Sequence, residues 1–484
     1  MAISLLHPTQ NNANPLPERM LYHLSLDRAF AYVCTDARKR ECFLSVVSAL
    51  SCDQKELLYR QEILQDFVRN PALRDELSSL ASRFEELKAS CKTAAADSYR
   101  MLSSNTASLT ASKNLLQIRA LCFKRALLFV KAYGELLGSY EIRSAGLQRL
   151  ADACREICGN PAYGELLAFC SRCEQTGADG FWNFRFALDE DGRIDEFELI
   201  DRRQLPLPDT APKKKGFLRF KKEEEPTRAE ETLALQCDGV LERLEISALN
   251  DLTGLFKSLS EQIFKRFGAL EKELVFYEVA LRYVGALSAK GVPLCYPTVS
   301  QTQKTDVRML YDLYLLLSAP DTRCVVPNDF VLDTSEEGLL VFGSNGSGKT
   351  VYLRSVGTMQ ILAQAGLPIP CKYAEITLFS QLAAQFSESE KEFCEGNDAG
   401  RFEQEVRELA AMADTLGEGA LVFLNETFQS TAYAEGASGL YHILRYFSAR
   451  GIRWILVSHL TQLADAFAPN QAAVLHTADG FRVV

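Results

Sequence analysis

Residues 343–350 have the residue types and spacing of a phosphate-binding loop. They read Gly343-Ser344-Asn345-Gly346-Ser347-Gly348-Lys349-Thr350 and match the pattern G-x-x-x-x-G-K-[ST]. Glycines let successive backbone N–H groups turn inward around a phosphate, and the start of the following helix adds its dipole. Lys349 would bring positive charge to the β- and γ-phosphates, and the Thr350 hydroxyl would ligate Mg²⁺. The pattern predicts a nucleotide site.

A second polar pair follows the apolar run 421–424. In nucleotide-hydrolysing proteins of this kind, the first residue of the pair is normally an Asp that holds Mg²⁺ through water, and the second is a Glu that polarises the attacking water. Here the pair is Asn425 and Glu426. We expect Asn425 to weaken Mg²⁺ affinity or turnover because an amide brings no negative charge, and we expect Glu426 to be the general base. A strand that ends in two solvated polar residues is the alternative.

A third apolar run, 453–457, is followed by Ser458 and His459. A histidine at the end of such a strand can sense phosphate or orient the water, and a capping role is the alternative. The runs 338–342, 419–424 and 453–457 are typical of strands buried on both faces. They predict an α/β domain with a mostly parallel sheet from about residue 325 onward.

The preceding 300 residues have a different pattern. From Pro17 to Gln175 apolar residues recur at three- and four-residue steps, as in the segments 55–67, 72–87 and 115–137, which predicts long amphipathic helices. A helical pattern resumes at Thr227 and runs to about Ala289, with a break at most around Asn250. The order of helices, insertion and returning helix predicts a helical lever that carries the intervening segment as an insertion.

The insertion between these helices has two parts. Alternating residues in 181–186 and 196–200 predict a β-hairpin. Its turn partly resembles a calcium-binding loop, because four residues fall at positions of that pattern: Asp189, Asp191, Gly192 and Glu198. We do not favour calcium, because Ala187 stands at the first ligand position and the flanking residues are strand-like. The second part, Lys213–Lys222, carries six basic residues and two phenylalanines. It could contact phosphates and stack on a base, although a solvated loop whose charges are offset by Glu223–Glu225 is the simpler interpretation.

Length, composition and cysteine content set further bounds. The chain has 484 residues, 47% hydrophobic and 24% charged, which excludes a wholly disordered or low-complexity protein. Its net charge of −10 excludes a uniformly basic nucleic-acid coat but leaves room for a local basic patch. The sequence shows neither a signal peptide nor a membrane span, and its 14 scattered cysteines predict reduced thiols in the cytoplasm. A four-thiolate zinc site is the less favoured alternative to buried thiols for one cluster, Cys154, Cys158, Cys170 and Cys173.

The C-terminal 160 residues resemble the ATPase domain of the MutS family. The similar segments occur in the family's order: 326–330 before the phosphate loop, 343–352 for the loop, 364–370 for the end of the next helix, 400–405 for the S-x-F-x-x-E signature, 425–436 for the D-E-x-G-R-G-T-S-x-x-D-G run, and 458–459 for Thr-His. Phe402 and Glu405 match the signature, with Gly400 in place of Ser.

The resemblance implies a multidomain fold, an all-α helical lever with a small β-hairpin insertion followed by an α/β ATPase domain of the ABC type with a phosphate loop. It implies ATP and Mg²⁺ as ligands, with Asn328, Phe402 and Glu405 added to the nucleotide site and Thr350, Asn425 and Glu426 at the metal. We expect five segments: an N-terminal tail (1–16), the helical lever (17–176), a clamp-like insertion (177–226), a returning helix and connector (227–324), and the ATPase domain (325–484).

The implied activity is ATP hydrolysis by a homodimer in which each signature segment completes the partner's site. By the same analogy, hydrolysis would move two levers around double-stranded or branched DNA in mismatch repair or a related pathway, with a repair protein as a further partner. The segments before the insertion leave no room for mismatch-reading and connector domains, so we expect a short form without them. Because of Asn425, a nucleotide-gated scaffold that hydrolyses slowly and recruits protein partners is the main alternative. A small-molecule kinase fits poorly.

Overall fold

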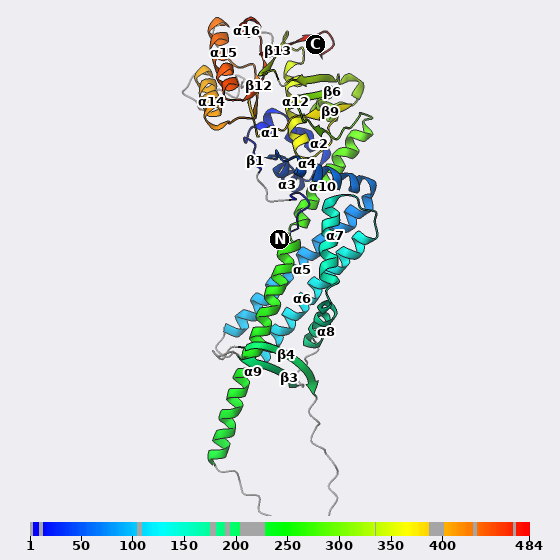
Figure 1. Cartoon of the computed structure of the whole chain (residues 1–484), viewed down its shortest axis with the longest axis vertical. Coiled ribbons are helices and arrows are strands. Elements are labelled where there is room, and N and C mark those ends of the chain that lie inside the picture. Colours follow the sequence, from blue (N-terminus) through cyan, green and yellow to red (C-terminus); the bar gives the residue numbers. More distant parts are fainter. Residues whose placement is uncertain are drawn as a thin grey trace, which may run out of the picture. The chain divides into compact units, whose positions relative to one another are not determined.

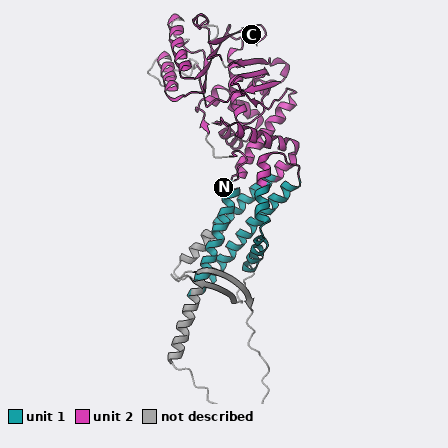
Figure 2. Ribbon diagram, viewed as in Figure 1, with its two compact units in different colours: residues 1–2, 77–139, 151–268 teal, residues 3–76, 140–150, 269–484 magenta. Residues whose placement is uncertain are grey.

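The computed structural model describes residues 3–8, 13–103, 109–174, 181–188, 194–203, 228–333, 335–386, 401–428, 433–467 and 471–484 (Figure 1). The chain divides into two compact units (Figure 2). Unit 1 is built from residues within Leu77–Ser139 and Ala151–Gly268. Unit 2 is built from residues within Ile3–Glu76, Tyr140–Leu150 and Ala269–Val484.

Unit 1 is a bundle of long helices around an aromatic core. The ring of Phe84 is buried and contacts four other aromatic rings, those of Phe129, Tyr133, Phe264 and Phe267. Ridges of apolar side chains pack in this way when long amphipathic helices lie side by side. The helices are most of α5 (Pro71–Ser103), all of α6 (Leu109–Gly138), part of α7 (Ala145–Cys158), α8 (Ala162–Glu174) and α9 (Arg228–Phe267).

The predicted β-hairpin is confirmed. Strands β3 (Phe181–Leu188) and β4 (Ile194–Arg203) pair antiparallel, with Phe181 opposite Arg203 and Phe186 opposite Phe197. The turn with the calcium-like residues Asp189, Asp191 and Gly192 lies outside the described residues, as does the basic segment Lys213–Lys222.

The helical pattern between 227 and 289 is interrupted at Gly268, and not around Asn250, the one position where the sequence allowed a break. Helix α9 continues through Asn250 because this polar side chain is exposed and interrupts no apolar face. Gly268 follows the end of α9, and α10 (Leu270–Ala289) begins two residues later.

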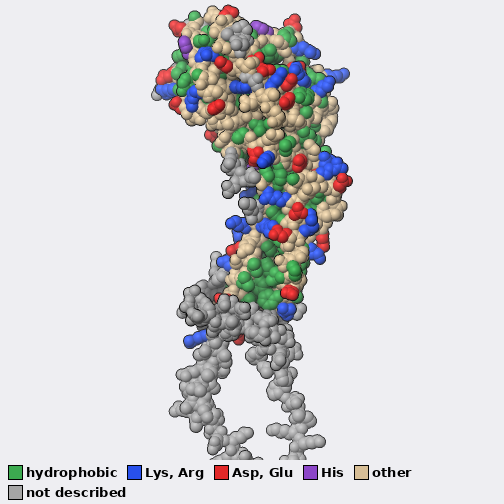
Figure 3. All heavy atoms as spheres, viewed as in Figure 1, with side chains coloured by type: hydrophobic (Ala, Val, Ile, Leu, Met, Phe, Trp, Pro, Cys, Tyr) green, Lys and Arg blue, Asp and Glu red, His purple; other side chains and the backbone are tan. Residues whose placement is uncertain are grey.

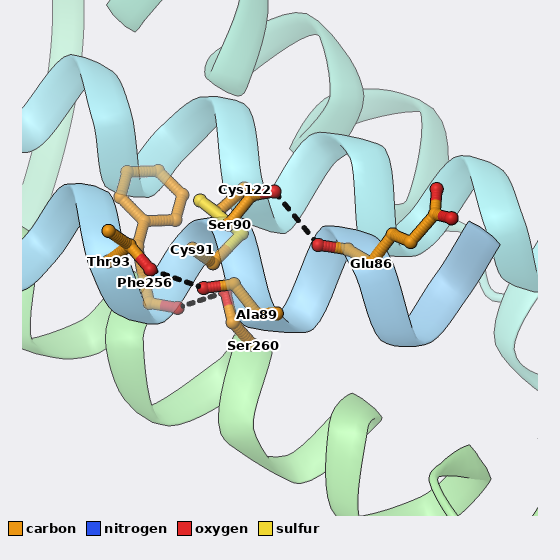
Figure 4. Close-up of a disulfide and its surroundings, with 8 residues drawn as sticks. All are labelled: Glu86, Ala89, Ser90, Cys91, Thr93, Cys122, Phe256 and Ser260. Carbon is orange, nitrogen blue, oxygen red and sulfur yellow. Dashed lines mark hydrogen bonds between the residues drawn. A yellow bond between two sulfur atoms is a disulfide. The ribbon is translucent and has the colours of Figure 1, made fainter. Parts of the chain in front are cut away.

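Cys91 on α5 and Cys122 on α6 form a disulfide in unit 1, with Cα atoms 6.0 Å apart (Figure 4). The expectation that every thiol is reduced is therefore wrong for this pair, because two adjacent helices bring the side chains to the spacing of a disulfide. Both cysteines are almost fully buried. The hydroxyls drawn around them, Ser90, Thr93 and Ser260, donate to carbonyls of their own helices, Glu86, Ala89 and Phe256.

Reduction of this disulfide should destabilise unit 1. The bond joins residues separated by 31 positions, and a cross-link of that span limits the unfolded chain by about 3–4 kcal/mol in the chain-entropy model. We expect a reductant to lower the free energy of unfolding by this amount in urea titrations followed by circular dichroism. The control is the double variant Cys91→Ala/Cys122→Ala, whose stability should not respond to reductant. Equal stability of the parent with the bond intact and broken would contradict the prediction.

Unit 2 contains a six-stranded sheet that is parallel except at one edge. The strand order is β10-β11-β12-β8-β13-β14, and only β14 runs antiparallel to its neighbour. The predicted runs form its centre as strands β8 (Gly338–Phe342), β11 (Ala420–Asn425) and β12 (Arg453–Val457), and nearly every residue in them is buried. The remaining strands are β10 (Gln381–Phe386), β13 (Ala472–Ala478) and β14 (Arg482–Val483).

Helices cover both faces of this sheet. One face packs in a single apolar cluster against α14 (Arg401–Thr415), α15 (Tyr433–Ala449) and α16 (Gln462–Ala466), with Trp454 of β12 fully buried in it. Helix α12 (Lys349–Gln364) contacts β11 and β12 and lies on the other side in Figure 1. Every residue of α12 from Ser355 to Gln364 is buried, which is typical of a helix enclosed on all sides.

The rest of unit 2 is a second, mixed sheet and a group of helices. The sheet has the order β5-β9-β6-β7. Its strands are β5 (Thr298–Val299), β6 (Thr305–Leu310), β7 (Asn328–Leu332) and β9 (Tyr373–Ile376). The other elements are α1 (Met20–His23), α2 (Leu26–Val33), α3 (Ala37–Val47), α4 (Gln54–Arg69), α10, α11 (Leu313–Ser318), the 3₁₀ turn η1 (Thr322–Cys324), and the short pair β1 (Asn14–Pro15) and β2 (Ala49–Leu50).

The protein is thus mostly helical with mixed sheets, as predicted. Through the described part of the chain, each helix is too short or too polar to cross a membrane.

Candidate functional site

The glycine-rich loop 343–350 joins the buried strand β8 to the start of α12. Gly343 has no room for a side chain, since a Cβ there would overlap the Thr477 hydroxyl of β13. Gly348 caps the helix with a φ of +96°, a conformation that favours glycine. The hydroxyls of Ser347 and Thr477 are 2.7 Å apart and tie the loop to the next strand of the sheet. The loop is therefore held from below by the sheet, and its helix starts with free N–H groups.

Lys349 is 4% exposed and reaches back over the loop. Its Nζ donates to the carbonyl oxygens of Gly343 (2.9 Å) and Ser344 (3.0 Å) and lies 3.6 Å from a carboxylate oxygen of Glu426. A buried ammonium group needs such partners because burial without them is costly. A phosphate group entering the site would offer this cation stronger acceptors than two neutral carbonyls.

Thr350 and Asn425 bring two neutral oxygens together. The Thr350 hydroxyl donates to Asn425 Oδ1 at 2.9 Å, from the first turn of α12 to the last residue of β11. Hydroxyl and amide oxygens are hard ligands of the kind that Mg²⁺ accepts, usually alongside waters and phosphate oxygens. The donor set fits Mg²⁺, with Glu426 as the nearby carboxylate.

Glu426 occupies a conformation that is unusual for this residue type. Its φ is +57°, and its backbone N–H donates to the carbonyl of Val457 at the end of β12. Its carboxylate oxygen lies 3.0 Å from Nε2 of His459. The same Nε2 lies 3.3 Å from Lys349 Nζ. We assign the Nε2 proton to the shorter contact, so that His459 donates to Glu426, because the carboxylate is the better acceptor.

The structure brings most of the predicted site residues together at one edge of the sheet. The site residues lie at or just after the ends of β8, β11 and β12, which are neighbours in the sheet: Lys349, Thr350, Asn425, Glu426 and His459. Polar groups at the carboxyl ends of parallel strands are the usual position of a ligand site in such sheets. A cavity of about 470 Å³ opens beside them, lined by residues 345–352, Glu426 and an apolar wall. The cation of Lys349 and the carboxylate of Glu426 thus face a space of ligand size.

Comparisons with known proteins concern the same region. The family model described as MutS domain V matches residues 339–478, which include the loop, Asn425, Glu426 and His459. The region that forms the site is therefore similar to domain V of MutS proteins.

Three relatives illustrate how far the similarity to MutS proteins extends. The DNA mismatch repair protein MSH2 of Zea mays is 23% identical over 206 residues, 42% of this chain and 20% of that protein. The endonuclease MutS2 of Shouchella clausii is 26% identical over 199 residues, 41% and 24% of the two chains. The DNA mismatch repair protein MutS of Granulibacter bethesdensis is 33% identical over 140 residues, 29% and 15%. The chain therefore spans less than a third of the length of each relative.

The two MutS signature residues are not brought to the cavity within this chain. Glu405 of α14 is buried, and its carboxylate accepts from the backbone N–H of Phe428 at 2.8 Å. Phe402 is 45% exposed, and its ring contacts that of Phe428 with centroids 4.9 Å apart. Both residues therefore anchor the segment that directly follows Glu426. Gly400 and the residues 429–432 of the other MutS-like run lie outside the described residues.

Asn328, the third residue that the MutS resemblance added to the site, lines the cavity but uses its amide elsewhere. Its Nδ2 donates to the carbonyl of Phe481 at 3.1 Å, and its Oδ1 accepts from the N–H of Val483 at 2.9 Å. Asn328 therefore holds the turn between β13 and β14 against β7.

The cysteine cluster consists largely of buried thiols. Cys154, Cys170 and Cys173 are buried, and burial raises the pKa of each thiol to about 12. Cys158 is half-buried. Within the described ranges, no three histidine, cysteine or acidic side chains are grouped so that they could hold a metal ion.

Sequence reasoning missed several residues around the site. Thr477 supports the loop, and Thr427 donates its hydroxyl to Gln385 in a fully buried contact beside Glu426. Phe481 lines the cavity from the C-terminal turn. The only sequence signal for Thr477 was the polar pair His476-Thr477 in an otherwise apolar strand. No local pattern pointed to Phe481, because its partner Asn328 is 153 positions away in the chain.

Proposed function

We propose that this protein is a MutS-type ATPase that binds ATP with Mg²⁺ and hydrolyses it slowly. The observation that carries the proposal is the meeting of Lys349, the Thr350–Asn425 pair and the Glu426–His459 pair at the edge of one cavity. The match of MutS domain V to the same residues supports it.

The loop and Lys349 bind the phosphates. Backbone N–H groups at the start of α12 point toward a phosphate, and the helix dipole favours its negative charge. Lys349 then exchanges its two carbonyl acceptors for phosphate oxygens. This exchange weakens its contact with Glu426 and leaves that carboxylate able to accept a proton.

Thr350 and Asn425 are the residues that would hold Mg²⁺, Thr350 directly and Asn425 through water. When bound, Mg²⁺ supplies positive charge that offsets the charge developing on the transferred phosphoryl group. Asn425 gives this position no negative charge of its own.

Glu426 is the general base in this proposal, and His459 positions it. The contact of 3.0 Å with Nε2 fixes one carboxylate oxygen and leaves the other to accept a proton from water. The φ of +57° sets the direction of the side chain and is maintained by the hydrogen bond to Val457. Glu405 accepts a hydrogen bond from the N–H of Phe428 and so fixes the backbone that follows Glu426.

The neutral amide of Asn425 favours a second candidate, a scaffold that binds nucleotide and scarcely hydrolyses it. The variant Asn425→Asp distinguishes the two. If the missing charge limits the reaction, Asn425→Asp should raise kcat or Mg²⁺ affinity by about 10-fold, the scale on which groups next to a metal act. Steady-state phosphate release at varied Mg²⁺ measures this effect, with Asn425→Ala as control. Unchanged turnover in Asn425→Asp would mean that the amide suffices and that charge is not the limit.

A homodimer is part of the proposal, by resemblance to the MutS family. The half-exposed ring of Phe402 at the start of α14 lies in the signature segment and is available to a partner. ATP-dependent change from monomer to dimer in light scattering would support this arrangement.

DNA is the proposed macromolecular ligand, in mismatch repair or a related pathway, together with a repair-protein partner. The three relatives include two named as DNA mismatch repair proteins. On the face drawn in Figure 3, acidic and basic side chains are interspersed over the described residues. The basic segment Lys213–Lys222 therefore remains our candidate for the DNA contact.

DNA binding should weaken as salt rises, with a slope set by the number of phosphates neutralised. Each contact contributes about −0.9 to the slope of log K against log salt, so replacing all six basic residues of Lys213–Lys222 with Gln should reduce the slope by up to about 5. Fluorescence anisotropy with duplex and branched DNA, with and without ATP, measures the slope. The control replaces exposed cations of unit 2, Lys55, Arg143 and Arg323, and should retain it. Salt-independent binding, or none, would remove the DNA part of the proposal.

A further inference from the structure

Cys295 and Cys371 meet in unit 2, although they are far apart in the chain. The N–H of Cys295 donates to the carbonyl of Ile369 at 3.0 Å, and the N–H of Ile369 donates to the carbonyl of Cys295 at 2.9 Å. Past Pro370 the chain turns tightly, because the N–H of Cys371 donates back to the carbonyl of Ile369 at 2.9 Å. This turn brings Cys371 to Cys295, and the two thiols share a hydrogen bond in which Cys371 is the donor.

The two thiols have different environments. Cys371 is fully buried, whereas Cys295 is half-buried. The hydrogen bond from Cys371 lowers the pKa of the Cys295 thiol to about 7, with a further bond from the N–H of Ala374 and against the effect of burial. The same bond raises the pKa of Cys371. Near neutral pH, Cys295 is therefore partly a thiolate, and Cys371 stays a thiol beside it.

Cys42 shows the contrast. It is also half-buried, but its thiol faces the carbonyl of Lys272 at 3.8 Å, and burial raises its pKa. The phenols that interact electrostatically with the Cys295–Cys371 pair, Tyr283 and Tyr373, have pKa values raised by desolvation and stay uncharged near neutral pH. The lowered pKa of Cys295 therefore comes from its two hydrogen-bond donors.

We propose that Cys295 and Cys371 form a redox site that hydrogen peroxide oxidises to a disulfide, with Cys295 as the attacking thiol and Cys371 as the resolving thiol. The Cys295 thiolate attacks one peroxide oxygen, the O–O bond breaks, and hydroxide leaves, which gives a sulfenic acid. The Cys371 sulfur then attacks the Cys295 sulfur, the S–O bond breaks, and water leaves with the Cys371 proton. Two electrons pass from the thiols to the peroxide. A partly exposed thiolate next to a resolving thiol is the arrangement of redox-sensitive cysteines.

The surrounding contacts keep the two sulfurs together in the reduced protein. The residues just before Cys371 are held by their carbonyls, which accept from the Tyr283 hydroxyl at Pro368 (2.8 Å) and from the N–H of Tyr311 at Pro370 (3.0 Å). On the other side, Gln61 donates to the carbonyl of Pro297 at 3.1 Å. Closing the disulfide therefore costs little chain entropy, because the two thiols are already held in contact.

The first test measures reactivity. Reduced protein is alkylated with iodoacetamide near neutral pH, and the modified peptides are quantified by mass spectrometry. Cys295 should react about 10-fold faster than Cys42, because more of it is thiolate. Cys371→Ala removes the donor and should slow Cys295 to about the rate of Cys42, whereas Cys371→Ser keeps a hydroxyl donor and should retain most of the rate. Equal rates for Cys295 and Cys42 in the parent would overturn the inference, as would an unchanged rate in Cys371→Ala.

The second test follows the oxidation. After hydrogen peroxide is added, the tryptic peptides 291–304 and 355–372 should be joined in the parent and separate again with reductant. These peptides contain neither Cys91 nor Cys122, so the signal is distinct from the disulfide of unit 1.

Two variants assign the roles of the two thiols. Cys371→Ser lacks the resolving thiol, so oxidation should stop at the Cys295 sulfenic acid, which dimedone traps. Cys295→Ser should give neither the sulfenic acid nor the joined peptides. Circular dichroism checks that both variants are folded. A parent in which peroxide oxidises Cys295 without joining the two peptides would overturn the inference, because Cys371 would then not act as the resolving thiol.

Discussion

Replacing Lys349 with alanine should weaken ATP binding by about 100-fold while the protein stays folded. Lys349 is the buried cation at the loop, with Nζ within 3.0 Å of two loop carbonyls and 3.6 Å from Glu426. Hydrogen bonds from a charged group to phosphate in a partly dry site are among the strongest that a side chain makes, and their loss costs a few kcal/mol. Titration calorimetry with ATP and Mg²⁺ measures the effect.

Two further variants make the result specific to the charge. Lys349→Met keeps the aliphatic stem and should lose as much affinity as Lys349→Ala. Lys372→Ala removes an exposed lysine of the same unit and should bind ATP like the parent. Thermal melts of all three variants check folding. If Lys349→Met binds ATP normally, the loop does not use its lysine for phosphate and the proposed site is incorrect.

Glu426→Gln should separate binding from hydrolysis. The amide has almost the same shape as the carboxylate but cannot accept a proton, so we expect kcat to fall by about 10³-fold, within the range of general-base effects. ATP affinity should be unchanged or somewhat higher because Lys349 loses a competing carboxylate partner. Single-turnover hydrolysis of radiolabelled ATP measures the chemical step directly.

The control for that step is Glu141→Gln, which alters a carboxylate that is exposed in unit 2 and should leave kcat unchanged. His459→Ala should show a smaller loss than Glu426→Gln, because it releases the carboxylate without removing it. Parent-like hydrolysis by Glu426→Gln would show that another group takes the proton.

The glycine-rich loop and the strands around it were predictable, because a contiguous motif after a buried run carries its own structural context. Contacts between segments that are distant in the chain could not be predicted. Asn328 was expected at the nucleotide, yet its amide binds a turn at Phe481 and Val483 that no local pattern connects to it. Within this chain the carboxylate of Glu405 accepts from the N–H of Phe428, a contact that no local pattern predicts, and its role at a partner's nucleotide stays a prediction.

In the helical part, too, the elements could be predicted from the sequence but the contacts between them could not. The helices, including α4, α5 and α6, follow directly from apolar periodicity. The disulfide between Cys91 and Cys122 depends on which faces of α5 and α6 meet, and periodicity does not define that pairing. The polar Asn250 suggested a break in a pattern that the structure continues, because a polar residue on an exposed helix face carries no such information.

The order of strands in the large sheet has a consequence for how the site forms. Strands β11, β12 and β8 are adjacent, yet β8 precedes β11 by about 80 positions in the chain, with α12 and α14 between them. Pairing of such distant segments is slow compared with helix formation, because a long stretch of chain must close first. Lys349, Asn425 and His459 therefore converge only when the sheet is complete. During refolding, the circular dichroism signal of the helices should return first and ATP binding last. Recovery of ATP binding would then mark the completion of the sheet.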